Sequence, residues 1–394
     1  MPLFLVFLRH IMLFHKHLLS ASLLFICCTL HASVNFDGKA SCQSESLLLT
    51  TDFESARVND CKINGNHVSI SIKPENKPIN DSPWYAFKLQ AKTASEVTVR
   101  VKYYGGKHRY HPKASVDGVS WTALPYRIKN GDLVFQVTLG DTPLLVAGQE
   151  IVSNHAYENW MQNIKTRFEL TSVSLGQSVQ GRAITALLSK GQSDKYLLVI
   201  GRQHPPEITG ALAYFPFSET LLENSTFRQH YNIVFVPNIN PDGVALGHWR
   251  HNVNGVDLNR DWKHFKQPET AAIKQYLDSI VKRGGKIAYG VDFHSTHHDV
   301  FYTMPQGKGL TPDDTTVNWL ERLALAEPNF TVLDKPGHNP GRGVFKQWLS
   351  DTYGVHAITY EMGDNTNRKV IKQVAISAAK TLSETLLNQS KTAK

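Results

Sequence analysis

The chain has 394 residues, of which 41% are hydrophobic and 19% are charged, so its composition is that of a globular protein and excludes extended disorder. Its formal charge of +8 comes without basic runs, which gives no case for a nucleic-acid partner and leaves solubility as the simplest interpretation. A chain of this length exceeds one comfortable hydrophobic core and therefore favours two domains.

The first 32 residues have the pattern of a secretory signal peptide. Residues 18–30 are apolar or small, they follow Arg9 and Lys16, and a small-residue exit comes after them. The apolar run is shorter than the roughly 20 residues of a membrane span, with an uncleaved anchor as the alternative. Removing these two basic residues lowers the formal charge from +8 to +6, because the segment contains no acid. We expect an exported protein, periplasmic or secreted, with no stable membrane span after signal removal, whether or not Met12 is the true start.

The cysteines divide between this segment and the rest of the chain. Cys27 and Cys28 leave with the signal, so the mature chain keeps Cys42 and Cys61. An even pair in an exported protein predicts a disulfide, with two unpaired thiols as the alternative. Closing the loop between them would stabilise the fold by about 3 kcal/mol in the chain-entropy model.

Residues 33–148 have the pattern of an antiparallel β-sandwich. Apolar and polar residues alternate with period two over His67–Ile72, Glu96–Tyr103 and Leu133–Leu139, and turn signals such as Asn64-Gly65 and Asn130-Gly131 lie between such runs. Short alternating strands at this spacing predict a sandwich, which we expect to be an accessory domain because it contains no reactive constellation.

Residues 149–394 have a different pattern, in which apolar strands alternate with longer amphipathic stretches. The predicted strands are Lys195–Ile200, Asn232–Val236, Lys286–Asp292 and His356–Tyr360. The predicted helices are Ile208–Glu223, Glu269–Lys282, Thr315–Ala326 and Val370–Leu387. This alternation predicts an α/β domain with a mixed, mostly parallel sheet and helices on both faces.

Four reactive side chains fall at the ends of these strands. His204 and Glu207 follow one predicted strand, and His294 and Glu361 lie at the ends of two others. Two imidazoles and one carboxylate suit one Zn²⁺, and three protein ligands leave a position open for water, as in catalytic sites. Because sites in α/β sheets form beyond the carboxyl ends of the strands, we expect all four side chains to converge.

The spacing of the first two ligands fits the start of a helix. Residues three apart on the first helical turn share a face, so His204 and Glu207 can reach one ion. Pro205 and Pro206 between them suit that position, because the first amides of a helix have no intrahelical acceptor to lose.

Several segments together resemble the zinc metallocarboxypeptidase family, which includes carboxypeptidase A. The resemblance extends over Tyr157–Leu387, and the preceding sandwich, with Ser82–Phe87, is similar to the accessory domain of the cytosolic carboxypeptidase branch, although the signal peptide departs from a cytosolic address. The segments that carry it, besides the one with the first two ligands, are Asn238–Gly243, His248–Arg250, Gly255–Trp262, Asp292–Ser295 and Thr359–Gly363.

The resemblance implies a role for each matching residue. His204, Glu207 and His294 match the zinc ligands. Glu361 matches the general base that takes a proton from a metal-activated water, and Arg250 matches the arginine that faces the oxyanion. Asn259 and Arg260 match the pair that grips the terminal carboxylate of the substrate. Since a guanidinium binds a carboxylate through two parallel hydrogen bonds, this pair implies removal of C-terminal residues from peptides.

Three further features extend or depart from the resemblance. Asp292 precedes a ligand and is a candidate to orient an imidazole. The family's substrate-covering tyrosine has no counterpart in Gly337–Gly343, and Tyr353 falls past that stretch. Arg342 and Lys346 fall in the region of the specificity pocket, where basic side chains would favour an acidic C-terminal residue.

Two rival functions remain open. One is a zinc-dependent acylase of the aspartoacylase kind, acting on N-acyl amino acids with a related site. The other is a non-enzymatic peptide-binding protein on a decayed peptidase scaffold, against which the full ligand set and Glu361 argue. We expect a monomer whose partner is the C-terminus of a peptide or protein, with no nucleic acid involved.

Overall fold

A computed structural model describes residues 40–392, which belong to one compact unit. The predicted signal peptide, with Cys27 and Cys28, lies outside the described residues. Between residues 40 and 392, no helix combines the length and apolar character needed to cross a membrane.

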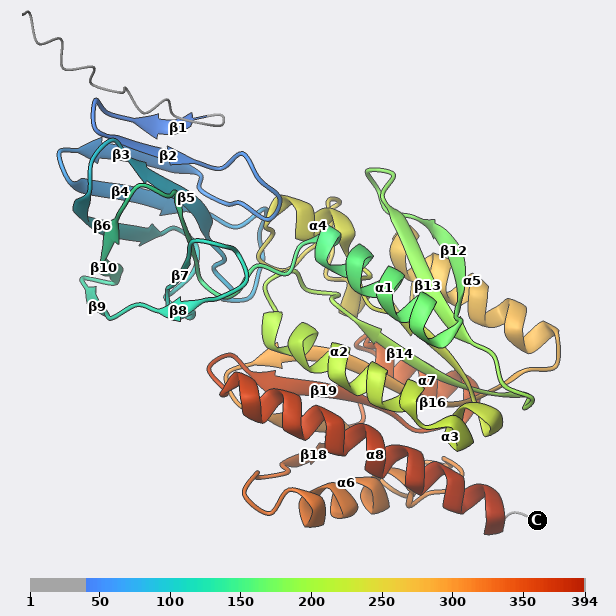
Figure 1. Cartoon of the computed structure of the whole chain (residues 1–394). Helices are drawn as coiled ribbons and strands as arrows, with labels where there is room; N and C mark the ends of the chain where they lie inside the picture. The colour runs from blue at the N-terminus through green and yellow to red at the C-terminus, as the bar shows by residue number, and fades with distance from the viewer. Residues whose placement is uncertain (1–39, 393–394) are drawn as a thin grey trace, which may run out of the picture. The chain divides into compact units, whose positions relative to one another are not determined.

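The first part of the described chain forms two packed sheets (Figure 1). The six-stranded sheet has the order β1 (Ala40–Gln43), β2 (Leu47–Thr50), β5 (Ala86–Ala91), β11 (Leu144–Ala147), β7 (Lys113–Ser115) and β8 (Thr122–Ala123). The five-stranded sheet has the order β3 (Asp60–Asn64), β4 (His67–Ile72), β6 (Ser95–Tyr103), β10 (Asp132–Leu139) and β9 (Tyr126–Lys129). The three strands predicted from alternation are β4, β6 and β10.

Alternating burial produces the core between these sheets. In β4, Val68, Ile70 and Ile72 are buried while the residues between them face outward, and Val97 and Val99 of β6 do the same. This is the period-two pattern of a sheet with one covered face. Strand pairing is antiparallel throughout these sheets except between β4 and β6, which run parallel.

The predicted disulfide is confirmed. Cys42 and Cys61 are bonded, with 5.9 Å between their Cα atoms. Cys42 belongs to β1 and Cys61 to β3, so the bond joins an edge strand of each sheet. It therefore cross-links the two layers of the sandwich.

The second part is built on an eight-stranded sheet. Its order is β12 (Thr171–Gln177), β13 (Ala183–Ser189), β15 (Asn232–Val236), β14 (Lys195–Gly201), β16 (Lys286–Thr296), β19 (Ala357–Gly363), β17 (Val300–Thr303) and β18 (Asp334–Pro336). The four central strands, from β15 to β19, run parallel, and β17 also pairs parallel with β18. The predicted mixed, mostly parallel sheet is confirmed.

Helices cover both faces of this sheet. They are α1 (Asn154–Phe168), α2 (Ile208–Glu223), α3 (Ser225–His230), α4 (Pro241–Leu246), α5 (Pro268–Lys282), α6 (Thr315–Ala326), α7 (Phe345–Tyr353) and α8 (Arg368–Thr392), with a 3₁₀ turn, η1 (Leu258–Arg260). Strand β14 contributes apolar side chains to both faces of the sheet. Leu197 and Val199 pack in one cluster with residues of α2 and α8, and Leu198 and Ile200 pack in another with residues of α5 and α7.

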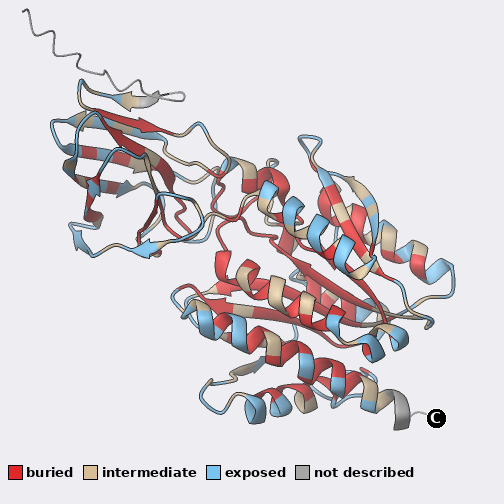
Figure 2. Cartoon of the chain, in the orientation of Figure 1, coloured by how far each residue is buried: buried red, intermediate tan, exposed pale blue. Residues whose placement is uncertain are grey.

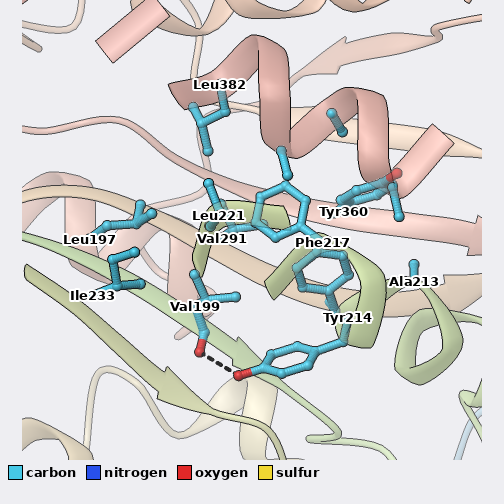
Figure 3. Packing of buried hydrophobic residues seen from close by; sticks show 14 of the residues in the cluster. Leu197, Val199, Ala213, Tyr214, Phe217, Leu221, Ile233, Val291, Tyr360 and Leu382 are labelled. Carbon is cyan, nitrogen blue, oxygen red and sulfur yellow. Dashed lines mark hydrogen bonds between the residues drawn. The ribbon is translucent and has the colours of Figure 1, made fainter. Parts of the chain in front are cut away.

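The helix α2 is buried between the sheet and α8. Its apolar residues face all round, as a fully covered helix requires, and Figure 2 shows it largely buried while the outer side of α8 is exposed. Figure 3 shows the rings of Tyr214 and Phe217 in this cluster, with the Tyr214 hydroxyl donating to the carbonyl of Val199 at 3.1 Å. This packing fixes the N-terminal end of α2, where the site lies.

Candidate active site

The four predicted reactive residues meet at the carboxyl edge of the central strands. His204 lies three residues beyond β14, His294 lies near the end of β16, and Glu361 lies near the end of β19. Strands β16 and β19 pair with His294 opposite Glu361. Glu207 is the residue before α2, and all four side chains line one cavity of about 340 Å³.

The donor atoms of the three predicted ligands converge on one point. Nδ1 of His204 lies 2.8 Å from one oxygen of Glu207, and Nδ1 of His294 lies 2.7 Å from the other. The two Nδ1 atoms are 3.1 Å apart, and one ligand atom from each residue falls within 4.8 Å of the others. These residues fit a divalent metal with mixed nitrogen and oxygen ligands, as Zn²⁺ prefers.

A carboxylate fixes each imidazole on the side away from Glu207, and that of Asp292 is buried while that of Asp257 is partly buried. Nε2 of His204 lies 2.8 Å from Asp257 Oδ1, and Nε2 of His294 lies 2.8 Å from Asp292 Oδ2. Because an ionised carboxylate only accepts, this contact places the proton on Nε2 and leaves the Nδ1 lone pair for a metal. Gln203 also donates to Asp292 at 2.7 Å, which holds that carboxylate in turn. The sequence indicated Asp292 as such a residue but did not single out Asp257, which lies within the segment Gly255–Trp262.

The local geometry of His204 and Glu207 differs from the prediction. The two residues do not share the first turn of a helix, because α2 begins at Ile208 and residues 203–206 form a separate turn. The cause is the residue pair Pro205 and Pro206, since the residue before a proline is driven away from helical backbone angles. The amide of Glu207 still bonds to the carbonyl of His204 at 3.3 Å, so the turn brings both side chains to the same side.

Electrostatics separate the two glutamates of the cavity. Burial raises the pKa of the Glu207 carboxyl, but the charges of His204 and His294 outweigh it and hold that pKa well below its usual range. Burial and the charge of Glu207 raise the pKa of Glu361 to about 8, opposed by His294 and Arg250. One oxygen of Glu361 is shielded from solvent and has no hydrogen-bond partner. Glu361 is thus a proton-accepting group kept out of the ligand network, and a bound divalent cation would favour its ionised form.

Arg250 enters the cavity beside the ligands. Its Nε donates to Asp257 Oδ2 at 2.8 Å, and its Nη1 lies 3.9 Å from Glu207. The side chain is buried and lines the same cavity as Glu361. Asp257 therefore bridges Arg250 and His204, one through each carboxylate oxygen.

Asn259 and Arg260 lie on η1 and also line the cavity. The Asn259 side chain accepts a hydrogen bond from the amide of Phe345 at 2.9 Å, and its nitrogen lies 3.3 Å from Nε2 of His294. Arg260 donates to the carbonyl of Asn259 at 2.6 Å. Burial lowers the pKa of Arg260, opposed by the charge of Asp257, yet a guanidinium remains charged at neutral pH.

The two residues predicted for the specificity pocket both line the cavity but differ in availability. Lys346 is buried, and its ammonium donates to the carbonyls of Thr303 at 2.8 Å and Gly337 at 2.5 Å. Burial lowers the pKa of Lys346 to about 8, with Asp334 opposing. Arg342 is exposed, and within residues 40–392 its guanidinium has no hydrogen-bond or ion-pair partner. Of these two residues, Arg342 is therefore the one whose charged group is free to meet a ligand.

The structure adds cavity residues that the sequence did not indicate. Tyr302 lies on β17 and lines the cavity, whereas Tyr353 lies on α7 and its ring packs against Trp348 instead. Arg109 reaches the cavity from the segment between β6 and β7 and forms a buried ion pair with Asp364 at 2.7 Å. No motif or spacing pattern in the sequence marked Arg109.

Comparison with known proteins gives family matches for both parts of the chain. Residues 157–385 match the family described as zinc carboxypeptidase, and residues 49–147 match the cytosolic carboxypeptidase N-terminal domain. An uncharacterized protein of Zymomonas mobilis is 22% identical over 262 residues, covering 63% of this chain and 66% of that protein. Cytosolic carboxypeptidase 6 of Mus musculus is 32% identical over 117 residues, covering 26% of this chain and 22% of that protein. The chain thus spans just under two thirds of the first relative and under a quarter of the second.

Solved structures show the same fold. A metallo-carboxypeptidase from Burkholderia cenocepacia superposes with a TM-score of 0.74 at 18% identity, over 87% of this chain and 99% of that one. A metallo-carboxypeptidase from Pseudomonas aeruginosa, solved with (2-guanidinoethylmercapto)succinic acid, gives a TM-score of 0.69 at 22% identity, over 85% of this chain and 98% of that one. At these identities the likeness concerns the fold alone.

The convergent donor set predicts that metal content depends on His204. We expect His204→Ala to lose at least about tenfold in zinc affinity, because only one imidazole and one carboxylate would remain. Elemental analysis after dialysis measures this. His298→Ala, which removes an exposed imidazole outside the donor set, is the control and should keep the wild-type metal content. Full zinc occupancy in His204→Ala would contradict the proposed ligand set.

Proposed function

We propose that this chain, which belongs to the zinc carboxypeptidase family, is a metallocarboxypeptidase that hydrolyses C-terminal residues from peptides with one zinc ion. The observation that supports it most is the arrangement of Glu361 beside His294 on neighbouring strands, in one cavity with the full ligand set. The metal, when bound, acts as a Lewis acid and lowers the pKa of water, which gives a nucleophile near neutral pH.

Each remaining residue has a role that its placement allows. Glu361 takes a proton from the attacking water and later passes it to the leaving amine. Arg250 donates to the oxyanion that develops on the scissile carbonyl, and such a donor contributes about two to three orders of magnitude in rate. Arg260, supported by Asn259, binds the terminal carboxylate and so places the last peptide bond at the metal.

Two aspects of this proposal stay predictions. They are the exported location and the division into residues 1–32, 33–148 and 149–394. The Cys42–Cys61 disulfide supports export, because disulfides persist in oxidising compartments.

The rival functions fit the cavity less well. An acylase for N-acyl amino acids has no need for a second domain beside its site, whereas Arg109 of the sandwich lines this cavity. A decayed binding protein has no need for a general base, yet the chain keeps both the complete donor set and Glu361.

The assignment of the general base predicts the effect of Glu361→Gln. The amide keeps the shape of the side chain but cannot take a proton, so we expect turnover to fall at least about a hundredfold while zinc content stays unchanged. Steady-state kinetics and elemental analysis on the same preparation measure both. Glu327→Gln, which removes a carboxylate at the end of α6 outside the cavity, should leave turnover unchanged. Wild-type turnover in Glu361→Gln would refute the role.

The carboxylate clamp predicts discrimination between a peptide and its amidated twin. We expect amidation of the C-terminus to lower kcat/KM by at least about a hundredfold, because the guanidinium of Arg260 loses a charged, bidentate partner. Arg260→Gln should remove most of this discrimination by slowing only the free peptide. An N-acyl amino acid tested in parallel separates the acylase. Equal cleavage of both twins would show that Arg260 does not bind the terminal carboxylate.

The free guanidinium of Arg342 supports a preference for an acidic C-terminal residue. We expect a C-terminal residue scan to favour glutamate and aspartate, and Arg342→Gln to lower kcat/KM for these about tenfold while leaving apolar C-termini unchanged. Lys346→Met is the comparison, because the Lys346 ammonium is already engaged by two carbonyls. A scan without an acidic preference would exclude this specificity and leave the peptidase assignment intact.

A further inference from the structure

One carboxylate of the sandwich binds the backbone of the segment that contains Arg250. Glu75 lies between β4 and β5, and its Oε1 accepts hydrogen bonds from the amides of Arg250 at 2.9 Å and His251 at 2.7 Å. Its Oε2 accepts from the amide of Trp249 at 2.8 Å. Three consecutive amides of the catalytic part, 174 to 176 positions away in sequence, are thus satisfied by one side chain.

Neighbouring contacts hold the same segment from both sides. Oδ1 of Asn76 lies 2.6 Å from Nδ1 of His251, and the side-chain nitrogen of Asn76 donates to the carbonyl of Gly255 at 3.0 Å. The ring of Trp249 is fully buried in the cluster that forms the sandwich core, and a Cβ on Gly106 would lie 2.7 Å from it. The segment is therefore docked by an indole as well as by hydrogen bonds.

The charge of Glu75 suits this task. Burial raises its pKa, but the hydrogen bonds from the amides of His251 and Trp249 and the nearby charge of His248 outweigh burial, so the pKa is lowered. An ionised carboxylate forms shorter and stronger hydrogen bonds to amides than a neutral group does. Glu75 therefore binds the segment as an anion at neutral pH.

We infer that Glu75 is a positioning residue for the reaction, because it fixes the backbone from which Arg250 reaches the oxyanion. Arg250 is then held at two points: its amide by Glu75 and its Nε by Asp257 at 2.8 Å. The inference rests on the proposed function and extends it, since it makes the sandwich part of the catalytic apparatus.

The expected effect follows from what an oxyanion donor does. Such a donor acts on charge that develops only in the transition state, and it must be preorganised to act. Loosening the backbone of Arg250 therefore lowers kcat, while the binding of the ground-state peptide by Arg260 persists. A role in folding alone would change stability and zinc content without this separation of kcat from KM.

Glu75→Gln tests the inference in the full-length, zinc-loaded protein. The amide replaces one of the accepting oxygens by a donor, so we expect kcat to fall about tenfold or more and KM to change by less than about threefold. The substrate is the peptide that the C-terminal scan finds best. Glu150→Gln is the matched control, because it removes a half-buried carboxylate bonded to Arg368 outside the cavity, and it should keep wild-type kcat.

A double-mutant cycle with Arg250→Ala decides whether Glu75 acts through Arg250. If it does, Glu75→Gln has no further effect on kcat once Arg250 is alanine, because nothing remains to be positioned. Multiplicative losses in the double variant would show that Glu75 acts elsewhere and would overturn the inference.

Ligand binding gives a readout that does not depend on turnover. A peptide phosphonate, whose tetrahedral anion mimics the oxyanion, should bind Glu75→Gln about tenfold more weakly than wild type in calorimetry, while the free C-terminal amino acid binds both equally. Unchanged phosphonate affinity with wild-type kcat would overturn the inference alone. A wild-type protein that cleaves no peptide of the scan would instead defeat the proposed function.

Discussion

The site depends on two imidazoles, each oriented by a carboxylate on the side away from Glu207. Asp257 and Asp292 each accept from the Nε2 side of one histidine, so both Nδ1 atoms turn inward toward Glu207. Without these two acids the rings could rotate or take the other tautomer, and the donor set would not converge. The convergence of the candidate metal ligands is therefore set by the residues that contact them from the other side.

The charge balance of this region gives a second reason for a divalent cation. The carboxyl groups of Glu207 and Glu361 both line the cavity, and burial together with the charge of Glu207 raises the pKa of Glu361 to about 8. Two carboxylates close together in a largely buried place are costly to keep ionised. A divalent cation held by His204, Glu207 and His294 would offset the charge of Glu207 and so favour the ionised form of Glu361.

The sequence predicted those parts of the molecule that depend on local pattern. Asn232–Val236 and Ile208–Glu223 are elements with the predicted bounds, because continuous apolar runs and helical spacing mark buried strands and helices directly. The ligands could also be found, since they occupy motifs at strand ends. Strand direction could not be predicted, because alternation reports which face of a strand is buried and not which way the chain runs. The parallel pairing of β4 with β6 is an example. The first turn before α2 was mispredicted, because the effect of two prolines on the preceding residue was overlooked.

The residues that the sequence could not reveal are those whose partners lie far along the chain. Arg109 and Asp364 are 255 positions apart, and single arginines and aspartates are too common to mark a pair by type alone. Asp257 lies within the segment Gly255–Trp262, but its contact with His204 spans 53 positions and so could not be inferred from that segment. Such contacts arise when the fold closes, so they need the topology rather than the pattern.

The sequence pattern changes near residue 148, but the loop that contains Arg250 depends on contacts with both parts of the chain. Between α4 and η1 the chain has no regular structure, so its amides need partners from elsewhere. Glu75 accepts hydrogen bonds from three of these amides, and Trp249 packs in the hydrophobic cluster of the sandwich, which also includes Ile208 and Ala211 of α2. Arg250, for which we propose contact with the oxyanion, thus takes its backbone position from one part of the chain and its side-chain orientation from Asp257 in the other. Removing the sandwich would leave the candidate metal ligands at the carboxyl edge of the sheet but would release the backbone of Arg250 beside them.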